Sequence, residues 1–146
     1  MGAEQSLGGR LRRFRDDHPP SADAVSWHVR RLLHCIHEHV FDAGLNVRTL
    51  KLHCGLRDNN ISCRFKNEVG VPIKTYIEHL RLDAASQLLQ GGVFSVSEVA
   101  HAVGYPHLQT FYRVYARRFG RTPGRCREPV SAVEAAGAGL RLEVEA

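Results

Sequence analysis

The chain has 146 residues, which leaves room for one domain or a pair of small subdomains with a real apolar core. Its formal charge is +5, and the basic excess is concentrated in residues 27–127, where 15 Lys and Arg stand against 7 Asp and Glu, a local net charge of +8. Such a balance suits binding to a polyanion, while no N-terminal apolar segment resembles a signal peptide or a membrane span.

The cysteines indicate in which cellular compartment the protein is found. The four of them, Cys35, Cys54, Cys63 and Cys126, include no C-x-x-C pair. Reduced thiols are the simplest interpretation of such a set when no feature indicates export. We therefore expect a cytoplasmic, nucleoid-associated protein that has free thiols and makes no contact with a membrane.

The first 23 residues have the composition of a flexible arm. Two glycines at Gly8-Gly9 and two prolines at Pro19-Pro20 disfavour regular structure in residues 1–23. A basic cluster lies in the same segment, formed by Arg10, Arg12, Arg13 and Arg15. Such a cluster either contacts phosphate groups or is simply solvated, and the sequence leaves both options open.

A supporting helix is expected over residues 24–41. Its apolar residues recur at spacings of 4, 3, 4 and 4, which places them on one face of a helix: Val25, Val29, Leu32, Ile36 and Val40. We expect this helix to pack under the segment that follows it.

One pattern occurs twice, offset by about 50 positions. In each copy an apolar pair leads to a glycine, and after a polar break a second apolar pair closes on another glycine. The first copy is Val47, Leu50, Gly55, Ile61, Phe65, Gly70 and Pro72, and the second is Val96, Val99, Gly104, Phe111, Tyr115, Gly120 and Pro123. This is the period of two short helices joined by a tight turn, the helix-turn-helix unit, whose second helix can enter a DNA major groove.

Capping residues sharpen the helix boundaries. Asn46 is a good N-cap for a helix over residues 47–54, and Ser95 with Glu98 forms an S-x-x-E capping box for its counterpart over residues 96–103. A further short helix is expected to start at Pro123, because proline is tolerated at the first helical position.

The expected fold is therefore all-α, with two helix-turn-helix subdomains joined by a long linking helix. The first subdomain covers residues 24–71, the linking helix residues 72–90 and the second subdomain residues 91–128, and a flexible acidic tail follows over residues 129–146. A continuous linking helix would fix the distance and the rotation between the two units.

This arrangement resembles the DNA-binding domain of the AraC/XylS family of bacterial transcription regulators over residues 27–127. The resemblance is strongest in residues 95–105 and 111–123, which read SVSEVAHAVGY and FYRVYARRFGRTP. It implies a monomer that places residues 58–68 and 108–118 as recognition helices in two successive major grooves. It also implies contact with RNA polymerase, and control either by abundance or by a sensory domain or protein partner outside this region.

The first unit departs from the family pattern at three positions. Lys51 stands where a small alanine is usual, Cys54 replaces a usual leucine, and Arg64 occupies a position that is usually apolar. A lysine there must carry its ammonium group to solvent along its alkyl stem, or the two helices must splay. We therefore expect a first unit that docks less tightly or is a degenerate partner of the second.

The outward face of the second unit carries side chains that can read bases. With Phe111 and Tyr115 inside, the expected base contacts are Leu108, Gln109, Thr110 and Arg113. Glutamine can pair with adenine N6 and N7, arginine with guanine O6 and N7, and threonine with a base edge or a thymine methyl. The alternative is a helix face that is merely solvated.

The matching positions of the first unit are weaker. With Ile61 and Phe65 inside, the expected base contacts are Asn59, Ser62 and Cys63, of which the thiol is the poorest reader. Five basic residues flank the two units as expected phosphate contacts: Arg57, Lys66, Lys74, Arg117 and Arg121. These five are otherwise ordinary solubilising charges.

Other functional classes have less support. His34 and His37 share a helix face, but zinc needs further ligands and Cys35 points away from that face. No catalytic constellation or phosphate-binding glycine loop stands out, so we expect neither an enzyme nor a cofactor. Two binding classes remain as alternatives: an adaptor module that retains the fold with weakened DNA binding, and an RNA-binding protein that uses its basic surface alone.

Overall fold

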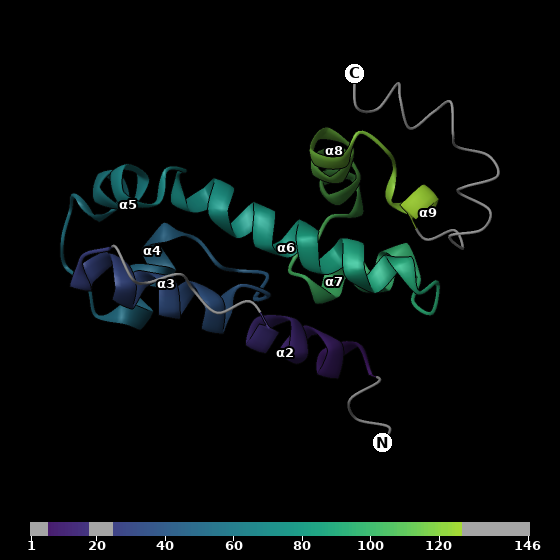
Figure 1. Cartoon of the computed structure of the whole chain (residues 1–146), viewed down its shortest axis with the longest axis horizontal. Helices are drawn as coiled ribbons and strands as arrows, with labels where there is room; N and C mark the ends of the chain where they lie inside the picture. The colour runs from purple at the N-terminus through teal and green to yellow at the C-terminus, as the bar shows by residue number, and fades with distance from the viewer. Residues whose placement is uncertain (1–5, 18–24, 127–146) are drawn as a thin grey trace.

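The computed structural model describes residues 6–17 and 25–126, and the regular structure within these residues is helical, without strands (Figure 1). The helices are α2 (Leu7–Asp17), α3 (Trp27–His39), α4 (Val47–Cys54), α5 (Ile61–Val69), α6 (Ile73–Gln90), α7 (Val96–Ala102), α8 (Leu108–Phe119) and α9 (Pro123–Cys126). Two helix-turn-helix units, α4–α5 and α7–α8, are joined by α6. The expected all-α fold is confirmed.

Helix α6 runs along the length of the molecule, and it contributes to two separate hydrophobic cores (Figure 1). Its first half buries Ile73 and Ile77 against α3, α4 and α5. Its second half buries Leu82, Ala85 and Leu89 against α7 and α8. The helix is continuous over 18 residues, as the sequence predicts, and it ends before Gly91. None of the helices in the described ranges is long and apolar enough to span a bilayer.

The first unit is tightly closed despite its unusual residues. Leu50 of α4 and Ile61 and Phe65 of α5 are all 0% exposed, while Lys51 is half-buried at the edge of the core. Gly55 ends α4 at a φ of 66°, a conformation that favours glycine, and starts the turn. Of the two outcomes expected for Lys51, the structure shows the first: the lysine remains partly exposed and the helices stay packed, so only the expected loosening of this unit is wrong.

Both predicted N-caps are present. The side chain of Asn46 accepts a hydrogen bond from the backbone N–H of Thr49 at 3.0 Å, and that of Ser95 accepts one from the N–H of Glu98 at 3.1 Å. In each box the third residue returns a bond, because the Glu98 carboxylate accepts from the Ser95 N–H at 2.8 Å and the Thr49 hydroxyl from the Asn46 N–H at 2.9 Å.

We expect Ser95→Ala to lower the free energy of unfolding by about 1 kcal/mol, because the N–H of Glu98 loses its acceptor. Urea unfolding followed by circular dichroism measures the change. Ser97→Ala is the matched control, since Ser97 is exposed two residues further along the same helix, and it should shift stability by less than about 0.5 kcal/mol. Equal losses in the two variants would contradict the assigned cap.

The N-terminal segment differs from the prediction. Residues 7–17, which were expected to belong to a flexible arm, form α2 and bury Leu11 and Phe14 in the second core. The helix forms because Leu7, Leu11 and Phe14 recur at spacings of 4 and 3, so that packing outweighs the cost of two glycines. The rest of the expected arm, residues 1–5 and 18–23, and the expected acidic tail lie outside the described residues.

The expectation of four free thiols is also wrong. The structure joins Cys35 of α3 to Cys54 of α4 as a disulfide, with Cα atoms 6.1 Å apart. The two residues are 19 positions apart in sequence and meet only because α4 packs across α3, so their spacing gave no sign of the pairing. Cys63 on α5 is a free, exposed thiol.

Candidate nucleic-acid interface

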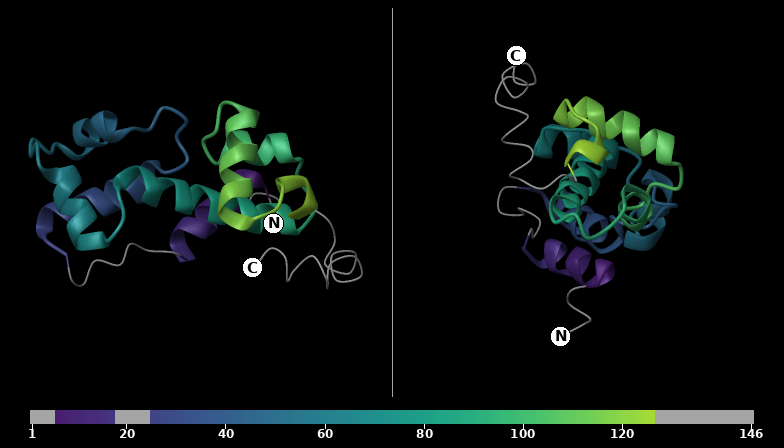
Figure 2. Two further views of the ribbon diagram at one scale, coloured as in Figure 1. Left: turned by 90° about the horizontal axis from the view of Figure 1, so that it is seen from above. Right: turned by 90° about the vertical axis from the view of Figure 1, so that its right-hand side faces the viewer.

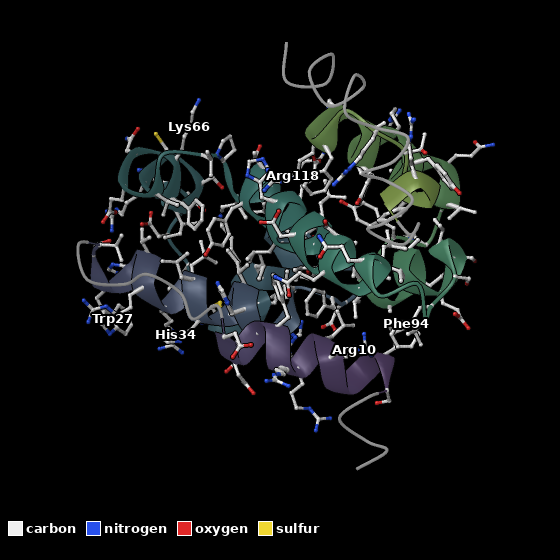
Figure 3. The ribbon with its side chains drawn as sticks, turned by 45° about the vertical axis from the view of Figure 1, so that its right-hand side comes forward. Arg10, Trp27, His34, Lys66, Phe94 and Arg118 are labelled. Atoms are coloured by element: carbon white, nitrogen blue, oxygen red, sulfur yellow. A yellow bond between two sulfur atoms is a disulfide. The ribbon has the colours of Figure 1, made fainter. Side chains whose placement is uncertain are left out.

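The second helices of the two units, α5 and α8, lie on one side of α6 (Figure 1). Helix α2 lies on the opposite side, which the end-on view in Figure 2 confirms for α2 and α8. Figure 3 shows Lys66 on α5 pointing away from the body of the protein, while Trp27 and His34 lie at the opposite edge of the molecule. One elongated face therefore presents both candidate recognition helices.

Helix α8 is strongly amphipathic. Phe111, Val114 and Tyr115 are buried in the second core, and Gln109 and Arg113 are exposed. These two side chains are therefore available to a partner. Thr110 and Leu108 are half-buried, and Leu108 packs against the core, so that only part of each side chain remains at the surface.

Helix α5 begins at Ile61, three residues later than predicted. The reason is a local turn, because the Asp58 carboxylate accepts a hydrogen bond from the Asn60 N–H at 2.8 Å and competes with helical pairing. Asn59 consequently lies in the turn before the helix and not on it. It is exposed, as are Ser62 and Cys63 on the first turn.

Arg64 causes no disruption at its usually apolar position. Its side chain is exposed, and one guanidinium nitrogen lies 3.5 Å from a carboxylate oxygen of Asp58 and 3.2 Å from Nδ1 of His28. The arginine thus ties the start of α5 to α3 at the protein surface.

A hollow lies between the two units and brings together residues that are distant in sequence. Its volume is about 480 Å³, and its basic lining residues are Lys74 and Arg81 of α6 and Arg113 and Arg117 of α8. Asn46, at the start of α4, and Thr110 also line it. Three of the predicted contact residues on α8 therefore share one basic hollow with Lys74, a residue of the linking helix.

Charge pairing distinguishes the arginines of α8. Arg117 donates to the Glu78 carboxylate at 2.9 Å, so part of its charge is neutralised within the protein. Arg118 donates to Asp83 at 2.6 Å and clamps α8 to α6. Neither pair can be predicted from the sequence, because both depend on the angle at which α8 crosses α6.

The other predicted phosphate contacts, Arg57, Lys66, Lys74 and Arg121, are exposed. Within the described residues none of these four is in an ion pair, in contrast to Arg117. Their charges are therefore available to a polyanion, and they are spread over the α4–α5 turn, α5, α6 and the segment after α8.

The histidines on α3 have separate surroundings. Nε2 of His37 lies 3.0 Å from the hydroxyl of Tyr76, so this buried ring connects α3 to α6. His34 is exposed. Among the described residues no group of three or more His, Cys, Asp or Glu side chains is placed to hold a metal ion.

Comparison with known proteins identifies the architecture. Residues 52–129 match the family model described as a helix-turn-helix domain. The chain is similar to the xylose operon regulatory protein of Escherichia coli (strain K12), with 33% identity over 105 residues that cover 72% of this chain and 26% of that protein. The chain thus spans about a quarter of the length of this curated relative.

Two solved structures have the same fold. The C-terminal domain of AraT, a response regulator from Geobacillus stearothermophilus, superimposes with a TM-score of 0.67 at 23% identity, covering 70% of this chain and 85% of that one. The DNA-binding domain of AdpA, solved in complex with a target DNA, gives a TM-score of 0.64 at 22% identity and covers 78% of this chain and 99% of that one.

Proposed function

The chain belongs to the AraC/XylS family of helix-turn-helix domains, and from that premise we propose that it reads DNA as a monomer through two major grooves. The observation that carries the proposal is the placement of α5 and α8 on one side of a continuous α6 (Figure 1). In a helix-turn-helix protein the second helix of the unit enters the major groove. Two such helices on one face suit two successive grooves on one side of the duplex.

We assign base reading chiefly to α8. Gln109 and Arg113 are exposed on its outer face, and their side chains are suited to adenine and guanine, respectively. Thr110 and Leu108 would add contacts from the start of the same helix. In the first unit, Asn59, Ser62 and Cys63 are the corresponding positions, and Cys63 adds little because a thiol is a weak donor.

Phosphate contacts would anchor the protein around these helices. Arg57, Lys66, Lys74 and Arg121 are exposed on or beside the two units, while Arg117 can contribute only in competition with Glu78. Lys74 and Arg117 both line the hollow between the units, which is where the backbone between two successive major grooves would pass.

We expect the affinity for DNA to fall steeply with salt. Each phosphate that is neutralised contributes about −0.9 to the slope of log K against log salt concentration, so a slope of roughly −4 to −8 is expected for the proposed contacts. Fluorescence anisotropy with a labelled duplex at several salt concentrations measures it. An affinity that hardly changes between low and high salt would contradict electrostatic anchoring.

The experiment that tests the function itself is selection of bound sequences from a random duplex pool, followed by footprinting. A monomer should protect an asymmetric site with two half-sites about 10 base pairs apart. Failure to enrich any sequence would favour the adaptor alternative. The structure does not favour that alternative as far as it depends on a loosely docked first unit, because this unit is closely packed around Leu50 and Phe65.

We propose a regulator without catalytic activity that contacts RNA polymerase when bound to DNA and acts as an activator. Its proposed cytoplasmic location follows from DNA as the partner and no longer from the thiols, since Cys35 and Cys54 form a disulfide. We also propose that a sensory domain or a protein partner supplies the signal, because the described surface offers a DNA-reading face and the curated relative is about four times as long as the matched region.

A further inference from the structure

The end of α3 is held by arginines from two other elements. Arg81, on α6, donates through Nε to the carbonyl oxygen of Val40 and through Nη2 to that of Asp42, both at 2.6 Å. Arg15, on α2, donates through Nη1 to the carbonyl oxygen of Glu38 at 2.9 Å. The last carbonyls of a helix have no partner within the helix, so cationic donors are well suited to this position.

Arg81 connects this helix end to the second unit. Its side chain is 8% exposed, and its guanidinium group lies 5.5 Å from the centre of the Tyr105 ring. It also passes directly under Gly104, where an added Cβ would lie 2.9 Å from the guanidinium carbon. Burial lowers the pKa of Arg81, and the nearby Tyr105 and Asp42 oppose that shift. One side chain thus contacts the turn of the second unit and donates hydrogen bonds to the end of α3, the helix that packs against the first unit.

Helix α2 covers the same junction from outside. The Phe14 ring lies 6.4 Å from the Phe41 ring, and the Arg15 guanidinium lies 6.0 Å from that ring. Phe41 packs against both cores, so it marks the seam between the two units. At the other end of α2, the Arg10 guanidinium lies over the Phe94 ring at 5.2 Å, and Figure 3 shows these two side chains together.

We infer that α2 and Arg81 form a brace that sets the rotation of the first helix-turn-helix unit relative to the second. Helix α6 alone fixes the spacing along its axis, but the first unit packs only on the first half of that helix and could rock about it. The brace prevents this rotation, because it holds the end of α3 to both α2 and α6. Phe14, Arg15 and Arg81 are therefore positioning residues for two-site DNA reading.

The α2 part of the brace does not lie on the face that is expected to contact DNA. Helix α2 lies on the side of α6 opposite α8, so Arg15 acts on recognition only through the orientation of the units (Figures 1 and 2). Arg12 lies on the outer, exposed side of the same helix and carries the same charge. It is the matched control, since Arg12→Met changes the net charge as Arg15→Met does but leaves the brace in place.

The distance between the recognition helices tests the inference without DNA. Spin labels are attached at the free thiol of Cys63 on α5 and at Gln109→Cys on α8, with Cys126→Ser to remove a further thiol. Double electron–electron resonance should give one narrow distance distribution for the parent and for Arg12→Met. We expect a clearly broader distribution in Arg15→Met, because methionine cannot donate to the Glu38 carbonyl. The same is expected in Arg81→Lys, because a single ammonium group cannot reproduce the two fixed hydrogen bonds of the guanidinium group.

Distance distributions of equal width in Arg15→Met and Arg12→Met would overturn the inference that α2 braces the two units. Arg15 is half-buried at the surface, so this result does not depend on the more deeply buried Arg81, and circular dichroism checks that each variant is folded.

A second measurement rests on the proposed function. Arg15→Met should weaken binding to a duplex with both half-sites about fivefold, as expected if only about one fifth of the molecules keep the competent orientation, and leave binding to a single half-site unchanged. Equal weakening on both duplexes would overturn the positioning role. If the parent selects no sequence at all, the proposed function fails, while the distance measurement still decides whether the brace exists.

Discussion

Arg113→Ala is expected to weaken binding to the preferred DNA site by about 1–3 kcal/mol and to relax specificity at one base pair. Arg113 is exposed on α8, where its guanidinium group can pair with both guanine acceptors, and alanine removes that pairing without disturbing the buried side of the helix. Titration of the selected duplex, and of duplexes with each base pair changed in turn, measures both effects.

Cys63→Ala is the comparison for the first unit. Cys63 occupies the corresponding exposed position on α5, and a thiol offers a base edge little, so we expect its loss to change affinity and specificity only slightly. If Cys63→Ala were the more damaging of the two variants, the assignment of α8 as the dominant reader would be wrong. A general loss of affinity in Arg113→Ala with unchanged base preference would make Arg113 a phosphate contact.

Ala84→Pro is expected to abolish specific binding to a site with two half-sites. Ala84 is in the interior of α6 and 1% exposed, and proline there removes a helical hydrogen bond and clashes with the preceding turn, at a cost of about 3 kcal/mol or more. A break there would change the spacing between the two recognition helices, whereas two successive major grooves require the helices that enter them to lie about 34 Å apart. Footprinting and mobility shift on paired and single half-sites measure the loss.

Ala84→Gly is the control for this prediction. Glycine keeps the backbone N–H and fits the same buried space, so it weakens the helix by only about 1 kcal/mol and should leave the paired-site footprint in place. Circular dichroism establishes whether each variant retains its helices. Full paired-site binding by a folded Ala84→Pro protein, or a palindromic footprint that needs two protein molecules, would show that α6 does not act as a rigid spacer.

The helices that the sequence predicts well are those with local boundary signals. The helix over residues 47–54 was predicted to the residue, because Asn46 caps its start and Gly55 its end. Helix α6 was predicted within one residue at each end, since Pro72 and Gly91-Gly92 enclose a long apolar stripe. These signals act within a few residues of chain, so they can be interpreted without the tertiary structure.

Errors arose where a local signal competed with packing. Two glycines in α2 argued for an arm, although the apolar spacing of Leu7, Leu11 and Phe14 was a sign of the helix. The apolar pattern predicts the start of α5 three residues too early, because the Asx turn at Asp58 has no signature in that pattern. In both cases a side-chain contact decided the backbone conformation.

Long-range features of the site could not be predicted at all. The outward positions on α8 followed from periodicity, but the hollow that joins Arg113 to Lys74 depends on how α8 crosses α6. The same applies to the Arg117–Glu78 pair, whose partners are 39 positions apart. Spacing along one helix fixes which side chains share a face, whereas their partners on other helices follow only from the packing of the cores.

The close approach of Arg81 to Gly104 makes the two units sensitive to each other's sequence. Gly104 has a φ of 106°, so its position in the turn already favours glycine, and the guanidinium group fills the space where a side chain would begin. A methyl group at Gly104 would therefore push Arg81 away from the carbonyls of Val40 and Asp42. Damage from a change in the second turn would then appear as frayed residues at the end of α3, and genetic suppressors would be expected there, in the other half of the protein.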